Sequence, residues 1–222
     1  MIMAQYKEST PFGIVMRALG DLITLNILWL VCAAPILTFG ASTTAMVSTM
    51  FKRRRYHGVP VVKTFLKEFG KNFRKATLIN LVFLVLTAIA VVDYMFVFQK
   101  ASGAVYYLYL GIASVALIAA LVILTFAFSQ LSVFENKVKN YIKNSFILAL
   151  IAPGRMLLCW VFFLIPWGIL FYVWYPYDFL AYFGAFYLIW GISGPAYLSV
   201  MQLEKVFARF GYKKDPADEE EE

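Results

Sequence analysis

The sequence has few charged residues, one histidine and two cysteines. Only 15% of its 222 residues are charged, whereas soluble domains carry about 25%. Apolar residues make up 62% of the chain, and the mean hydropathy is +0.73. A soluble domain of this length leaves about 30% of its unfolded surface in water, so it has no room for such an apolar excess. The composition argues against a soluble enzyme, a disordered chain and a nucleic-acid-binding domain, and predicts an integral membrane protein.

Residues that carry common chemistry are also scarce. His57 lies in a basic segment without cysteine or acidic neighbours at metal-ligand spacing, so no metal site is expected. The sequence contains no Gly-x-x-x-x-Gly-Lys-Ser/Thr loop, no Gly-x-Ser-x-Gly turn and no His-Glu-x-x-His pair. Cys32 and Cys159 both lie in apolar runs, which argues against a disulfide. We therefore expect no catalytic residues, no cofactor and no enzymatic activity.

The hydrophobic runs predict an all-α, polytopic transmembrane bundle that forms one domain over residues 1–210, followed by an acidic tail over 211–222. Thr10 and Pro11 are a typical helix start, and Pro35 ends or kinks the first span. The run at 36–51 is short, and periodicity leaves it open as a second crossing, a half-buried hairpin arm or a re-entrant piece. The sequence thus predicts five long or kinked spans and this short one. They lie at about 12–34, 36–51, 76–98, 104–128, 156–174 and 179–200.

The basic residues predict the orientation of these spans. Nine Lys or Arg residues lie in 52–75, four in 131–155 and four after residue 200, while the two short hairpin links contain only Lys100. Because basic segments stay on the cytoplasmic side, we expect them to lie inside, together with the C-terminus. Lys7 and Arg17 favour a cytoplasmic N-terminus as well, which requires 36–51 to cross; five crossings would place it outside.

Two basic amphipathic helices are predicted between the spans, one over 62–74 and one over roughly 133–149. In the first, apolar residues recur at helical spacing, from Val62 to Phe73, and basic residues occupy the other faces. Such a helix either lies in the lipid headgroup layer and anchors the topology, or docks a partner protein. The candidate docking residues are Lys63, Lys67, Lys71 and Arg74.

Two acidic residues, Asp21 and Asp93, lie within predicted spans. Burial of a charge in lipid is costly, which makes intramembrane acids candidates for function. The alternatives are a position at headgroup level or a bonded contact inside the bundle. No pair of acids, Asp–Lys pair or histidine chain marks an ion path.

One block of sequence resembles a known family. Asn26–Leu30 (NILWL) followed by Ala34–Ala45 (APILTFGASTTA) is similar to the pattern of the YesL-like family of bacterial polytopic membrane proteins, a family without an established function. The stretch at 65–75 is similar to the basic amphipathic stretch that comes next in that family. From this block we take a structural signature: Asn26, Trp29, Pro35, Thr38 and Gly40. A helix break at Pro35 frees backbone groups, which Thr38 and the hydroxyl side chains after it can satisfy. Gly40 and the small residues around it allow a close helix approach, and Asn26 is placed to bond across to another helix.

The resemblance implies a bacterial cytoplasmic membrane protein that assists a carbohydrate ABC importer by binding its permease subunits. The chain lacks the Glu-Ala-Ala loop of such permeases, so it does not resemble a permease itself. An independent small-solute transporter or channel and an assembly or lipid-interacting factor remain open. The sequence names no sugar, no partner and no oligomeric state.

Overall fold

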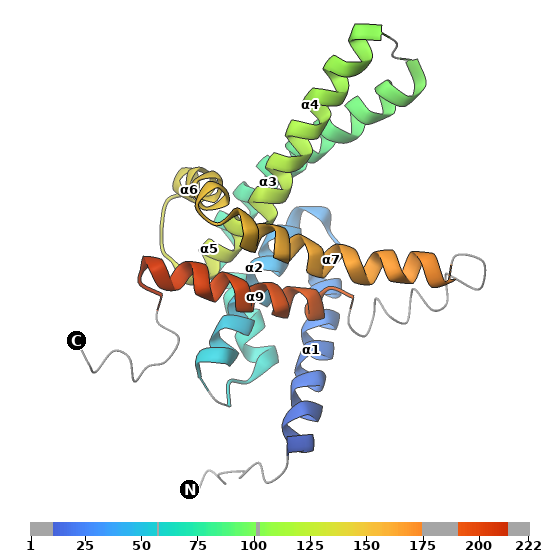
Figure 1. Cartoon of the computed structure of the whole chain (residues 1–222). Helices are drawn as coiled ribbons and strands as arrows, with labels where there is room; N and C mark the ends of the chain where they lie inside the picture. Colours follow the sequence, from blue (N-terminus) through green and yellow to red (C-terminus); the bar gives the residue numbers. More distant parts are fainter. Residues whose placement is uncertain (1–10, 57, 101–102, 175–190, 213–222) are drawn as a thin grey trace, which may run out of the picture.

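The computed structural model describes residues 11–56, 58–100, 103–174 and 191–212 (Figure 1). Within these ranges every element is helical, as the sequence predicts. In chain order they are α1 (Pro11–Ala33), η1 (Ile36–Thr38), α2 (Phe39–Arg55), α3 (Val61–Lys100), α4 (Gly103–Val122), the π-helical turn η2 (Ile123–Ala127), α5 (Phe128–Val133), α6 (Val138–Ile151), α7 (Pro153–Trp174), α9 (Ser193–Phe207) and η3 (Ala208–Phe210).

Three helical segments are long and apolar enough to cross a membrane: Val15–Ala33, Val61–Phe98 and Gly103–Val133. A fourth is counted if α6 and the start of α7 form one broken span, since they meet at a bend of 99°. Their length and hydropathy fit a membrane-embedded protein, with fewer candidate spans in the described ranges than the sequence predicts. Residues 179–190 of the last predicted span and most of the acidic tail lie outside those ranges.

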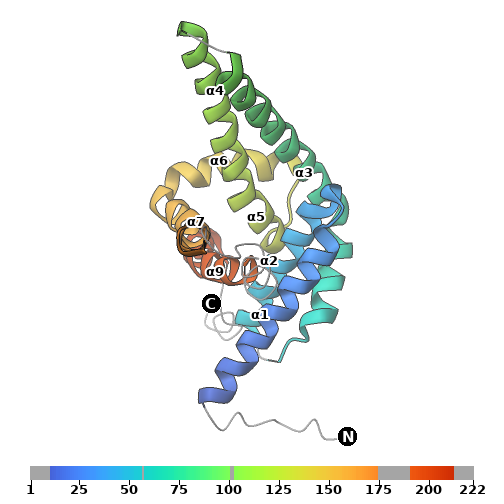
Figure 2. The same cartoon turned by 90° about the vertical axis from the view of Figure 1, so that its right-hand side faces the viewer.

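The run at 36–51 is not among the candidate spans. It forms η1 and most of α2, which returns antiparallel to α1 as the second arm of a helical hairpin (Figure 2). Every residue from Gly40 to Phe51 is buried, because α1, α3, α5 and α9 all pack around α2. Small side chains let neighbouring helices approach on all sides. The structure therefore shows this run as a helix that runs back along α1 and is fully rather than half buried, an arrangement common to a hairpin arm and to a second crossing.

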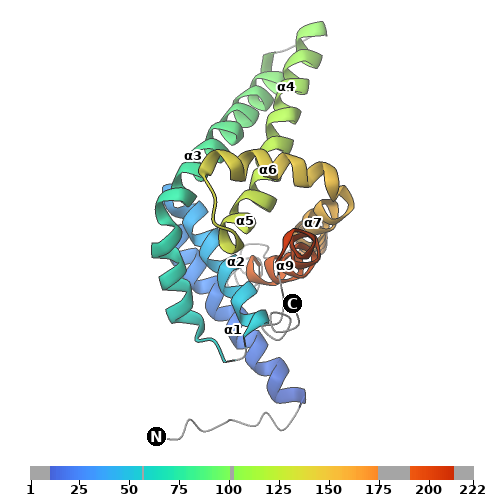
Figure 3. The same cartoon turned by 90° about the vertical axis from the view of Figure 1, so that its left-hand side faces the viewer.

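Helix α3 differs from the expectation of an interfacial helix followed by a separate span. Its 40 residues form one helix, about 60 Å long at 1.5 Å per residue, roughly twice the thickness of a bilayer hydrocarbon core. The sequence from Phe73 to Leu78 contains no Gly or Pro to break the helix. The basic N-terminal half of α3 packs against α2 of the α1–α2 hairpin. The apolar C-terminal half continues the same helix beyond that hairpin (Figure 3).

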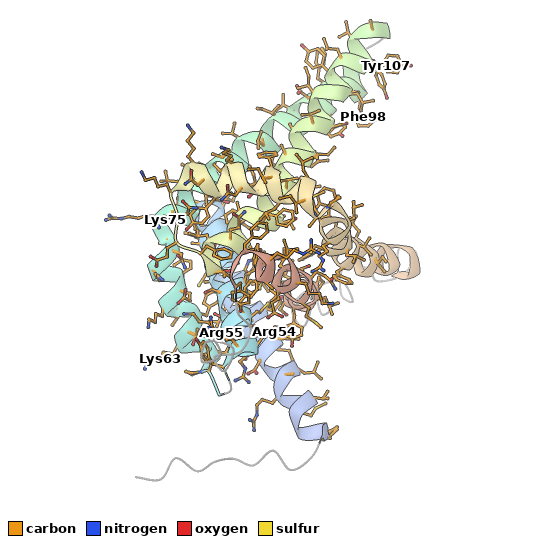
Figure 4. All side chains as sticks on the ribbon, turned by 60° about the vertical axis from the view of Figure 1, so that its left-hand side comes forward. Arg54, Arg55, Lys63, Lys75, Phe98 and Tyr107 are labelled. Carbon is orange, nitrogen blue, oxygen red and sulfur yellow. The ribbon has the colours of Figure 1, made fainter. Side chains whose placement is uncertain are left out.

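The apolar halves of α3 and α4 form a helical hairpin that projects from the rest of the chain (Figures 1 and 3). Large apolar side chains point outward from both helices: Val92 is 64% exposed, Phe98 76%, Tyr107 73% and Val115 69%. Phe98 and Tyr107 lie near its tip (Figure 4). Such a surface is suited to lipid or to another membrane protein, and unsuited to water.

Candidate functional site

The break between α1 and α2 is held by two polar side chains. Thr38 Oγ1 lies 2.6 Å from the Cys32 carbonyl oxygen and 2.8 Å from that of Pro35, so its hydroxyl hydrogen can satisfy the Cys32 carbonyl that the end of α1 leaves free. From α3, Asn80 Nδ2 donates to the carbonyl oxygens of Ile36 at 2.9 Å and Leu37 at 3.2 Å. The expectation that Thr38 satisfies freed backbone groups is confirmed, while the role of Asn80 is not predicted by the sequence.

Gly40 lies where α2, α3 and α5 meet. A Cβ atom at this position would stand 2.7 Å from Phe128 Cε1, 2.8 Å from the Ala76 carbonyl oxygen and 2.8 Å from Asn80 Cβ. These distances are far shorter than van der Waals contact. The predicted close helix approach at Gly40 is therefore present, and it explains why this position requires glycine.

Asn26 and Trp29 connect α1 to two other helices. Asn26 is fully buried, and its Oδ1 accepts hydrogen bonds from the backbone N–H groups of Ile192 at 3.2 Å and Ser193 at 3.1 Å, at the start of α9. The side chain thus caps a helix that lies more than 160 positions later in the sequence. Trp29 Nε1 donates to Thr43 Oγ1 of α2 at 3.1 Å. The interhelical bond predicted for Asn26 is confirmed.

The basic end of α2 forms ion pairs with three different helices. Lys52 Nζ lies 2.5 Å from Glu68 Oε1 of α3, and Arg53 pairs with Asp21 of α1. Arg54 Nε lies 2.8 Å from Glu204 Oε1 of α9. We call these three pairs the α2 ion-pair hub. Asp21 is therefore a bonded contact of the bundle, which is one of the alternatives that the sequence leaves open.

Arg54 also contacts Tyr197 of α9. Its Nη1 donates to the Tyr197 hydroxyl at 2.9 Å, and its guanidinium lies 5.3 Å from the centre of that ring. Burial by itself lowers the pKa of the Arg54 guanidinium, but the hydrogen bond and charge of Glu204 outweigh burial and raise it. The guanidinium is therefore held in its charged form between α2 and α9, among the helices rather than outside them (Figure 4).

Glu68 is the most enclosed acid of the hub. It is 3% exposed, and its Oε2 accepts from Ser48 Oγ at 3.0 Å and from Asn72 Nδ2 at 3.3 Å, in addition to the Lys52 contact at Oε1. Its buried carboxylate is thus satisfied at both oxygens, as a buried charge must be. Glu68 is not among the residues predicted from the sequence, although Phe65, Glu68 and Asn72 fall on one helical face.

The candidate docking residues lie on the exposed side of the basic half of α3. Lys63, Lys67, Lys71 and Arg74 are all exposed, and Lys71 Nζ lies 3.0 Å from Glu135 Oε1. The hydrogen bond from Lys71 lowers the pKa of the Glu135 carboxyl. Figure 4 shows Lys63 and Lys75 pointing away from the rest of the chain at the two ends of this face. Packing leaves these cations accessible to a partner or a headgroup.

The other candidates take no part in the hub. Asp93 is half-buried in the apolar half of α3, and forms no ion pair with any residue that the structure describes. His57 falls outside the described ranges. Within them, His, Cys, Asp and Glu side chains form no group of three that could hold a metal ion, and Cys32 and Cys159 are both unpaired.

An apolar cavity of about 320 Å³ lies among α1, α2, α7, α9 and the helical segment formed by α4, the π-helical turn and α5. Trp29 and Trp160 face it from α1 and α7, and Met46 from α2. Trp160 Nε1 donates to Thr125 Oγ1 of the π-helical turn at 2.9 Å. π-Helical turns are rare and often occur at functional sites. Ligand sites in helical membrane proteins commonly lie between helices, so this cavity is a second candidate site beside the hub.

Comparison with known proteins finds a family match for the part of the chain that contains the break between α1 and α2. Residues 22–94 match the sequence model of a family described as a protein of unknown function, DUF624. The chain matches no curated protein and no solved structure. The matched range runs from α1 through α2 into the apolar half of α3, and includes all five signature residues: Asn26, Trp29, Pro35, Thr38 and Gly40. The family description assigns no function, and the similarity to the YesL-like family stays a resemblance.

Proposed function

We propose that this chain is a non-catalytic protein of the bacterial cytoplasmic membrane that associates with the permease subunits of a carbohydrate ABC importer. The importer as partner class comes from the resemblance to the YesL-like family. The structural observation that supports it best is α3, in which an exposed cationic face and a membrane-spanning half form one continuous helix.

Such a helix suits a partner that has both a membrane part and a cytoplasmic part. An ABC importer is of this kind, because its permeases cross the bilayer and its ATPases lie below it. The projecting α3–α4 hairpin offers an apolar surface within the bilayer. The cationic face offers Lys63, Lys67, Lys71 and Arg74 below it. One rigid element would therefore contact both layers of the importer.

We propose that both termini lie in the cytoplasm. The positive-inside tendency of the three basic segments supports this for the C-terminus. The Arg53–Asp21 pair supports it for the N-terminus, because it joins the N-terminal half of α1 to the basic end of α2. Reporter fusions at each terminus, one active only inside the cell and one only outside, test this orientation. An N-terminal fusion that is active only outside would contradict it.

The partner proposal is tested by recovering the tagged full-length protein from native membranes in mild detergent, with crosslinking, and identifying the co-purifying proteins by mass spectrometry. We expect permease subunits of a carbohydrate importer. A quadruple Gln variant at Lys63, Lys67, Lys71 and Arg74 should weaken that recovery. Its matched control replaces the exposed lysines of the α5–α6 region, Lys137, Lys139 and Lys143, with Gln.

The outcomes separate the candidate functions. If the quadruple variant recovers as much permease as the control variant does, the docking surface is not the cationic face of α3, and the α3–α4 hairpin becomes the candidate. Recovery of the protein alone, even after crosslinking, would contradict the partner proposal. Solute uptake by vesicles containing only the purified protein would instead support an independent transporter or channel.

A further inference from the structure

The apolar cavity is large enough for more than a small solvent molecule. Its volume is about 320 Å³, roughly twice that of an engineered 150 Å³ cavity that stays dry and binds benzene. Its walls come from α1, α2, α4, the π-helical turn, α5, α7 and α9. Representative lining residues are Trp29, Met46, Leu124, Trp160, Ala196 and Leu203. Protein cores are normally packed without voids of this size, so we expect a bound molecule to fill the cavity.

The two indole groups facing the cavity are not available to a polar ligand. Trp29 Nε1 donates to Thr43 Oγ1, and Trp160 Nε1 donates to Thr125 Oγ1. Thr125 Oγ1 in turn donates to a backbone carbonyl of its own helix at 2.8 Å. Both tryptophans therefore present ring surface to the cavity while their N–H groups are used within the protein.

The remaining polar side chains of the lining are also engaged within the protein. Ser129 Oγ donates to the Thr125 carbonyl oxygen at 2.7 Å, and Ser199 Oγ donates to that of Pro195 at 2.9 Å. Cys159 Sγ approaches the Ser199 carbonyl oxygen at 3.9 Å. A sugar or an ion entering this space would lose hydrogen bonds to water without replacement, which is costly. The lining selects for an apolar group.

The cavity reaches an apolar part of the molecular surface. Leu164 of α7 lines it and is itself 68% exposed, so it marks the rim. Val161 and Ile165, its neighbours on α7, are exposed as well. This stretch belongs to the fourth candidate membrane segment, which places the rim where the surrounding solvent is lipid.

We propose that the cavity accommodates one acyl chain of a membrane lipid, which enters past Leu164 and packs between Trp29 and Trp160. The chain would fill the space between α2, α7 and α9 and so link the three helices. The headgroup would remain outside, at the rim. This inference rests on the cavity alone and does not depend on the importer as partner.

The test is photolabelling of the purified full-length protein in vesicles of phosphatidylethanolamine and phosphatidylglycerol. The vesicles contain a trace of phosphatidylcholine with a diazirine near the end of one acyl chain. Labelled peptides are mapped by mass spectrometry. We expect adducts at cavity residues that are buried from the bulk lipid, Met46 and Leu203. Adducts on the exposed hairpin, at Val92 or Val115, serve as the internal control for labelling by bulk lipid.

Filling the cavity should abolish the buried adducts. Ala196→Trp adds an indole from α9 into the space, and Val115→Trp adds the same group to the lipid-facing side of the hairpin as a control. We expect loss of the Met46 and Leu203 adducts in A196W and their retention in V115W. If A196W does not give a monodisperse protein, Val47→Phe fills the same cavity from α2.

Two results would overturn the proposal. One is labelling of the wild-type protein on the hairpin alone. The other is persistence of the Met46 adduct in the monodisperse cavity-filling variant, because the label would then reach α2 by another route. Neither result bears on importer binding, which the pull-down measures separately.

Discussion

Arg54 and Glu204 join two helices that lie 150 positions apart in the sequence. Arg54 Nε is 2.8 Å from Glu204 Oε1, and the two side chains are only 16% and 8% exposed. The pair lies at the end of α2, where Lys52 and Arg53 bind acids of α3 and α1. The basic residues at the end of α2, which the sequence alone identifies as a topology signal, thus also form ion pairs that join α1, α3 and α9 to α2.

Removal of Glu204 should destabilise the bundle. Glu204→Ala leaves the Arg54 guanidinium largely buried without its carboxylate, and breaking a buried ion pair from one side costs about 3 kcal/mol. Thermal unfolding in detergent, followed by size-exclusion chromatography, measures the loss. The matched control is Lys71→Ala, since the Lys71–Glu135 pair is exposed and should leave the transition unchanged. Equal transitions for the two variants would contradict the role of the hub.

Gly40→Ala should destabilise the contact of α2 with α3 and α5. The added Cβ would meet Phe128, Ala76 and Asn80 at 2.7–2.8 Å, and overpacking of this kind costs about 1–3 kcal/mol. Gly111→Ala is the control, because a Cβ there meets nothing within 4 Å. In a helix this second change should stabilise slightly, by about 0.5 kcal/mol or more. Opposite shifts of the thermal transition are the expected result, and a stabilised Gly40→Ala protein would contradict the tight packing.

Parts of the fold follow from the sequence because the cause is local. Pro11 starts α1, and Pro35 lies two residues beyond its last residue, Ala33, as helix-start and helix-breaking residues predict. Gly40 is predicted to be a close contact because small residues cluster around it. The long runs at 76–98 and 104–128 are identified by hydropathy alone. The partners of these elements are not local, so neither Asn80 at the break nor Glu204 at the hub is predicted.

The basic half of α3 shows where periodicity misleads. Phe65 and Phe69 pack inward, but Val62, Leu66 and Phe73 of the expected apolar face are exposed. The buried face instead runs through Phe65, then Glu68, Asn72, Ala76 and Ile79. Two polar residues on that face hide it from a hydropathy pattern: Ser48 and Lys52 of α2 bond to the buried Glu68 carboxylate, and Asn72 bonds to Glu68 in turn. Such compensation depends on tertiary contacts, so the periodicity of α3 alone does not reveal it.

Asn26→Leu should loosen the start of α9. The change keeps the approximate size of the side chain but removes the acceptor for the N–H groups of Ile192 and Ser193. Unsatisfied buried donors cost about 1–3 kcal/mol. Thr24→Ala is the control on the same helix, since Thr24 Oγ1 donates to the Gly20 carbonyl oxygen of that helix. We expect a lower thermal transition for Asn26→Leu alone, and faster amide hydrogen exchange at the start of α9. Unchanged exchange there would contradict the capping role.

Thr125→Val should destabilise the wall of the cavity. Valine has nearly the shape of threonine but removes the acceptor of the Trp160 N–H group. Because Trp160 is only half-buried, the cost should lie near the low end for an unsatisfied donor, about 1 kcal/mol. Thr87→Val is the matched control, since Thr87 Oγ1 donates to the Phe83 carbonyl oxygen of its own helix.

A double-mutant cycle separates the hydrogen bond from other effects of Thr125→Val. Trp160→Phe removes the donor, so Thr125→Val should cost less in that background than in the wild-type chain. The thermal transition of each variant gives the coupling between the two positions. Thr87→Val should show no coupling to Trp160→Phe. Equal costs of Thr125→Val in both backgrounds would mean that the hydroxyl stabilises the π-helical turn through its bond to Leu121 rather than through the indole.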